Sequence, residues 1–147
     1  MMDDPRITRP REPWAVSFGL LAVVAGCLVA ALVFMALVWT VLSAAPDAEL
    51  AAAGIDATPG RLAFLMGGFA AIGFLVVGPT LAFAVGWLLR RVRNQSLHVL
   101  AFAALGAVVG AAGGFVIGGP QFANVLGAMV GVSVAAGRAA LAPFARV

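Results

Sequence analysis

The stretch LGAVVGAAGGFVIGG, residues 105–119, places a glycine at every fourth position: Gly106, Gly110, Gly114 and Gly118. Four residues are slightly more than one turn of an α-helix, so these glycines share one helix face and leave a shallow groove along it. The next apolar segment carries a matching row of small residues, Ala123, Gly127, Gly131 and Ala135. Only a turn around Gly119 and Pro120 separates the two segments. The pattern predicts a membrane hairpin whose two helices pack through their glycine faces.

The composition extends this interpretation to the whole chain. Apolar residues form 63% and charged residues 10% of the 147 positions, whereas soluble domains contain about 45–50% apolar and about 25% charged residues. Long apolar runs, each approaching or exceeding the roughly 20 residues that cross a bilayer as a helix, cover residues 14–46, 62–89, 97–120 and 121–137. They do not alternate apolar with polar residues as barrel strands do. We predict an all-α integral membrane protein with four transmembrane helices in two antiparallel hairpins.

The predicted organisation is a short polar tail followed by one membrane domain. Residues 1–13 contain three prolines and mixed charges and are expected to form a cytoplasmic N-terminal tail. Residues 14–147 are expected to form a four-helix transmembrane domain, with spans at about 14–45, 59–89, 97–118 and 121–142. Thr58 and Pro59 suit the N-cap and first position of the second span.

The arginines predict the orientation of these spans. The N-terminal tail, the loop at residues 90–98 and the C-terminal end are basic, whereas the loops at 46–61 and 118–122 hold one arginine between them. Because positive residues are retained on the cytoplasmic side, both termini are expected there. All nine basic residues are arginine and the chain has no tyrosine, a bias typical of a GC-rich bacterial genome. We therefore expect a multi-pass protein of the bacterial cytoplasmic (inner) membrane.

Three of these arginines, Arg90, Arg91 and Arg93, directly follow the second span. Such a cluster acts as a topology determinant, and it is also a candidate for contact with an anionic lipid such as cardiolipin. The net charge of +3 could in principle suggest a nucleic-acid partner. Since the arginines lie where membrane topology requires them, no nucleic-acid partner is predicted.

Two residues inside the spans raise specific alternatives. Pro79 removes one backbone hydrogen bond and predicts a kink in the second span, which is either a static bend or a hinge. Residues 24–27, VAGC, resemble a bacterial lipobox, in which Cys27 would carry a lipid. The residues after Cys27 stay apolar and continue a membrane span. This continuation favours an unmodified cysteine within a helix.

Candidate catalytic residues are lacking. Ionisable residues at the middle of a span are the usual sign of proton relays, ion paths or catalysis, and the four runs contain none there. His98 is expected near the cytoplasmic interface in a solvated or headgroup-facing position. Ser133 lies deeper and is expected to bond to a preceding carbonyl of its own helix. We predict no enzyme activity, no metal and no cofactor.

Two functional hypotheses follow from this inventory. In the first, the chain is a non-enzymatic accessory or scaffolding subunit whose glycine-rich helix faces pack against a partner membrane subunit or against further copies of itself. The packing residues are then Gly106, Gly110, Gly114, Gly118, Gly127 and Gly131. In the alternative, several copies assemble a homo-oligomeric pore or channel, or the chain is a small transporter, with a hinge at Pro79.

Overall fold

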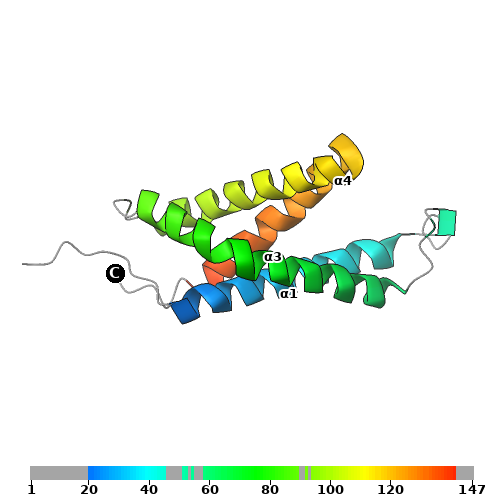
Figure 1. The fold of residues 1–147 in the computed structure, drawn as a ribbon, viewed down its shortest axis with the longest axis horizontal. Coiled ribbons are helices and arrows are strands. Elements are labelled where there is room, and N and C mark those ends of the chain that lie inside the picture. Colours follow the sequence, from blue (N-terminus) through cyan, green and yellow to red (C-terminus); the bar gives the residue numbers. More distant parts are fainter. Residues whose placement is uncertain are drawn as a thin grey trace, which may run out of the picture.

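The computed structural model describes residues 20–45, 51–52, 54, 58–89, 92 and 94–141. Within these ranges the chain forms three long helices and no strand (Figure 1): α1 (Leu20–Ala44), α3 (Pro59–Leu88) and α4 (Gln95–Ala140). All three helices are long and apolar enough to cross a membrane, judged by length and composition. The predicted all-α class and its membrane-compatible helices are therefore confirmed.

The longest helix, α4, consists of two arms that meet at a sharp change of direction. Backbone torsions leave the helical region only at Gly118 (φ −147°, ψ 19°) and Gly119 (φ 75°, ψ −161°). The torsions of Gly119 fall in a region that is essentially restricted to glycine. Pro120 follows, where its fixed φ and missing N–H suit the start of a helix. We call residues 95–117 the first arm and residues 120–140 the second arm.

The number of helices differs from the prediction. The sequence predicts four spans, whereas the described residues contain three helical elements, because the third and fourth predicted spans both belong to α4. Gly118 and Gly119 interrupt the helical backbone between these two spans, and helical torsions resume directly after them. At 1.5 Å per residue, the two arms measure about 35 Å and about 32 Å, each close to the thickness of a bilayer core.

The starts of α3 and α4 follow local capping rules. Thr58 is the N-cap of α3, with extended backbone torsions but no side-chain capping hydrogen bond, and Pro59 occupies the first helical turn. Asn94 is the N-cap of α4, and its side-chain Oδ1 accepts a hydrogen bond from the Ser96 backbone N–H at 3.0 Å. The side-chain oxygen thereby satisfies one of the N–H groups that every helix start leaves without an intrahelical partner.

Helix α1 lies between α3 and the second arm of α4. It contacts both, whereas α3 and α4 touch at few positions. The buried core is centred on Phe34, Val38 and Ala63, with Leu126 and Met129 of the second arm packed against it. Phe34 also meets Phe74 of α3 edge-to-face, with ring centroids 6.4 Å apart. The helices therefore follow the spatial order α3, α1, second arm, first arm, and α3 does not close against the first arm.

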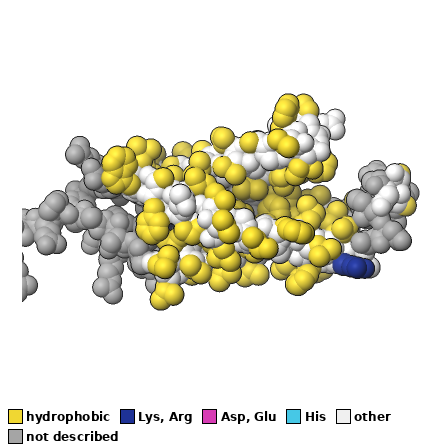
Figure 2. Space-filling view, in the orientation of Figure 1, with side chains coloured by type: hydrophobic (Ala, Val, Ile, Leu, Met, Phe, Trp, Pro, Cys, Tyr) yellow, Lys and Arg dark blue, Asp and Glu magenta, His cyan; other side chains and the backbone are white. Residues whose placement is uncertain are grey.

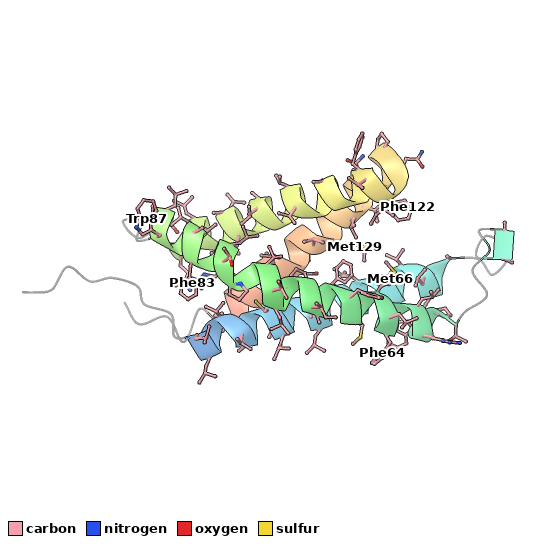
Figure 3. All side chains as sticks on the ribbon, in the orientation of Figure 1. Phe64, Met66, Phe83, Trp87, Phe122 and Met129 are labelled. Atoms are coloured by element: carbon pink, nitrogen blue, oxygen red, sulfur yellow. The ribbon has the colours of Figure 1, made fainter. Side chains whose placement is uncertain are left out.

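This open order leaves the outer faces of the helices apolar and exposed. Hydrophobic side chains cover the face seen in Figure 2 along the length of the helices. On α3 the exposed large side chains include Phe64, Phe69 and Trp87, and on the first arm they include Val116 and Ile117. In Figure 3, Trp87 and Phe122 lie near opposite ends of the first arm of α4. Such surfaces suit lipid or another apolar helix rather than water.

Candidate functional site

The glycines of the first arm lie directly against the backbone of the second arm. A Cβ atom placed on Gly114 would lie 2.5 Å from the carbonyl oxygen of Phe122, and one on Gly110 would lie 2.7 Å from that of Leu126. At Gly106 the same atom would lie 3.1 Å from the carbonyl oxygen of Val130. Any side chain at these positions would therefore push the two backbones apart.

The glycines of the second arm make the reciprocal contacts. Cβ atoms on Gly127 and Gly131 would each lie 3.0 Å from a first-arm carbonyl oxygen, that of Ala107 and that of Ala103 respectively. Gly118, at the turn, lies against the ring of Phe122. The structure thus brings all six glycines of the predicted packing set, Gly106, Gly110, Gly114, Gly118, Gly127 and Gly131, to one seam. Close backbone approach of this kind strengthens dispersion contacts and permits Cα–H···O contacts between helices.

A second pair of close contacts joins α1 to α3. A Cβ atom on Gly67 would lie 2.8 Å from Met35 Cβ, and one on Gly78 would lie 2.8 Å from Cys27 Sγ. Higher numbers on α3 meet lower numbers on α1, so these two helices are antiparallel. Sequence reasoning does not single out Gly67 and Gly78, because alanine and glycine are so abundant that short rows of small residues arise by chance.

A third contact joins α1 to the second arm. Gly137 lies against the carbonyl oxygen of Gly26, and a Cβ atom on it would lie 3.2 Å from Ala30 Cβ. Ser133, one turn earlier, is fully buried, and its Oγ donates a hydrogen bond to the Met129 carbonyl at 2.7 Å. This bond confirms the expected pairing of Ser133 within its own helix.

The remaining residues that the sequence singles out have mixed outcomes. Pro79 lies inside α3, which stays helical on both sides of it. In Figure 1 the C-terminal part of α3 rises away from α1. Cys27 lies within α1, with helix before and after it. The predicted lipid-contact residues Arg90, Arg91 and Arg93 lie outside the described residues.

Two basic side chains lie in positions that the sequence does not predict. His98 is only 5% exposed, although it is expected in a solvated position, and its Nε2 lies 2.9 Å from the Val92 carbonyl oxygen. Arg138 belongs to the basic C-terminal end and falls near the end of the fourth predicted span; it lies in the last turn of α4 and is only 7% exposed. Burial of a side chain depends on tertiary packing, which local sequence does not reveal.

The described residues bring together no group of three or more His, Cys, Asp or Glu side chains that could hold a metal ion. A comparison of the chain with known protein families, with curated proteins and with solved structures finds no match. The most distinctive local feature of the described chain is therefore the seam of backbone contacts within α4.

Proposed function

We propose that this chain is a small, non-enzymatic, multi-pass protein of the bacterial cytoplasmic membrane that serves as an accessory or scaffolding subunit. In this proposal α1, α3 and the two arms of α4 each cross the bilayer once, and both termini are cytoplasmic. The observation that carries it is the combination of a tightly packed glycine seam with outer helix faces that pack on no other described helix.

The glycine seam supports a structural role for a rigid hairpin. At Gly110 and Gly114, carbonyl oxygens of the second arm occupy the space that a side chain would need. Helices in lipid associate through such close packing, because burying apolar surface from water no longer drives them together. A hairpin held in this way can present a fixed outer surface to a neighbouring subunit.

The outer helix faces support the proposal that the chain has a partner subunit. A Cβ atom on Gly68 or Gly73 of α3, or on Gly113 of the first arm, would meet nothing within 4 Å. These positions have no packing role among the described residues, and each would allow the backbone of another helix to approach closely. The open order α3, α1, second arm, first arm places them on the two outermost helices.

The test is a native mass measurement of the full chain, gently extracted and purified in detergent, with and without prior crosslinking in the membrane. We expect co-purification with a different membrane protein in a fixed ratio. Changing Gly73 and Gly113 to leucine should reduce this co-purification and leave the melting temperature unchanged. Purification as a ring of identical copies would contradict the accessory role and favour the homo-oligomeric pore.

The proposed topology makes a separate prediction. A reporter enzyme that is active only outside the cytoplasm should be inactive when fused after Val147, and active when inserted at Gly119, in the turn between the arms. The positive-inside rule gives this expectation. The reverse pattern of reporter activity would invert the topology. Activity at both positions would show that the two arms do not cross the membrane as a hairpin.

A further inference from the structure

Helix α3 presents one regular row of exposed residues on its outer side. Spacings of three and four residues alternate along the row, and every member is exposed. This alternation is the heptad spacing with which two helices pack side by side at about 20°. Because α3 is outermost in the order α3, α1, second arm, first arm, the row is left for a neighbour outside the described chain. We call this row the α3 stripe: Met66, Phe69, Gly73, Val76, Thr80 and Phe83.

The length of the stripe matches the thickness of a bilayer. A hydrocarbon core of about 30 Å covers about 20 residues of helix. Centred on α3, which runs from Pro59 to Leu88, such a core covers about residues 64–83. The stripe therefore lies within the hydrocarbon along its whole length, given the membrane location proposed above.

Gly73 makes the middle of the stripe thin. A Cβ atom at this position would meet nothing within 4 Å, so no contact of the described chain requires a glycine here. Phe69 and Val76, about one turn to either side, are large and exposed. A glycine between larger residues allows the backbone of a second helix to approach closely while the larger side chains pack around the crossing point.

Thr80 adds a polar group to the same stripe. The hydroxyls of Thr40 and Ser133 each donate to the carbonyl oxygen four residues earlier in their own helix. Within the described part of the chain, the exposed hydroxyl of Thr80 makes no such bond. Lipid chains offer no hydrogen-bond partner to a hydroxyl, whereas a side chain of a neighbouring helix does.

We propose that the α3 stripe is the interface of a symmetric dimer, in which it packs against the α3 stripe of a second copy of this chain. Two copies in one membrane share the same orientation, so a two-fold axis along the bilayer normal makes the two helices parallel and brings equal positions together. Gly73 then meets Gly73 at the crossing point. Thr80 meets Thr80, and because a hydroxyl both donates and accepts, each hydroxyl gains a partner.

The charge and the position of the stripe agree with this occupant. None of its six side chains is charged, so equal positions of two copies can meet without repulsion. The inference rests on the membrane location in the proposed function and goes beyond it, since it assigns the outer face of α3 to a second copy. The first arm, with Gly113, remains available to the unlike partner.

The first experiment measures the native mass of the full chain, purified in mild detergent. We expect a dimer, and Gly73→Leu should convert it to a folded monomer, because leucine would hold the two helices apart while meeting nothing within its own chain. Gly68→Leu is the matched control. A Cβ atom at Gly68 also meets nothing within 4 Å, but five residues place it about 140° around the helix from Gly73, so the dimer should persist.

The second experiment tests the same two positions in the membrane. Single cysteines replace Gly73 or Gly68 in a chain that carries Cys27→Ser, and membrane-permeant iodine oxidises them. A disulfide forms only where the two Cα atoms come within about 7 Å. We expect Gly73→Cys to give a crosslinked homodimer in a denaturing gel, and Gly68→Cys to stay mostly monomeric.

The third experiment tests the hydroxyl of Thr80. Thr80→Val keeps the shape of the side chain and removes the hydroxyl, so the dissociation constant of the dimer in detergent should rise about three- to tenfold, as for a lost hydrogen bond between membrane helices. Thr80→Ser retains the hydroxyl and should dimerise as the wild type does. A purely steric role would give the opposite order, because valine is closer to threonine in shape.

The outcomes separate this dimer from the proposed function. A dimer that persists in Gly73→Leu, or equal crosslinking from positions 68 and 73, would overturn the interface and leave the accessory role standing. Crosslinking of Gly73→Cys only to a different protein would overturn the second copy as occupant and support an unlike partner at this face. Recovery of the native chain in the soluble fraction of cells would contradict the membrane location, the dimer and the proposed function together.

Discussion

Replacing Gly114 by leucine is expected to lower the melting temperature of the detergent-purified chain by about 2–12 °C. The first atom of any side chain at this position would lie 2.5 Å from the carbonyl oxygen of Phe122, which is backbone and cannot rotate away. Overpacking of this kind costs about 1–3 kcal/mol, and a chain of this size loses about 2–4 °C per kcal/mol. Gly110→Leu should behave similarly, because its first side-chain atom would lie 2.7 Å from the Leu126 carbonyl oxygen.

The matched control is Gly113→Leu on the same arm. A Cβ atom there would meet nothing within 4 Å, so the melting temperature should stay within error of the wild type or rise slightly. Leu105→Ala, beside the seam, should also have little effect. Wild-type melting of both Gly110→Leu and Gly114→Leu would show that the arms do not pack through this seam.

The second prediction concerns an engineered disulfide between α1 and α3. Cys27 is the chain's one cysteine, and its Sγ lies 2.8 Å from the Cβ position of Gly78. The two Cβ atoms of a disulfide lie about 3.5–4.5 Å apart. A cysteine at position 78, with its Cβ this close to Cys27 Sγ, is compatible with that spacing. We expect Gly78→Cys, oxidised by membrane-permeant iodine, to form an intramolecular bridge in most molecules. The measurement is faster migration of the monomer in a denaturing gel, reversed by reductant.

Gly73→Cys provides the comparison for this bridge. It adds a cysteine to the same helix at a position where a Cβ atom would meet nothing within 4 Å, so it should give little intramolecular product. Combining Gly78→Cys with Cys27→Ser should abolish the bridge. Equal bridging from positions 73 and 78 would mean that α3 does not hold the described orientation against α1.

The sequence predicts the helical class and which residues share one face of a helix, because both are local properties. A spacing of four residues places Gly106, Gly110 and Gly114 on one side of any helix that contains them. Apolar length likewise predicts which segments can cross a bilayer. These inferences do not need to know which helix lies next to which.

Neighbours and burial could not be predicted in the same way. His98 and Arg138 are almost fully buried, and burial depends on tertiary packing rather than on the sequence around each residue. The contact between Gly78 and Cys27 depends on the rotation of α3 about its own axis. Neither the packing around a side chain nor the rotation of a helix produces a periodic pattern in the sequence. Alanine and glycine are also so frequent that the short rows of small residues that do form contacts cannot be told from chance rows.

The position of the second arm has a consequence for biosynthesis. This arm contacts α1 through Gly137 and the first arm through Gly127 and Gly131, yet it is the last of the described helices to leave the ribosome. Helices α1 and α3 can pair as soon as both are inserted. The first arm, which follows them, has few contacts with α3 that could hold it in place. The two halves are therefore joined only at the end of synthesis. A chain terminated near Pro120 would leave the glycine groove of the first arm uncovered in the bilayer, available to other proteins or to membrane proteases.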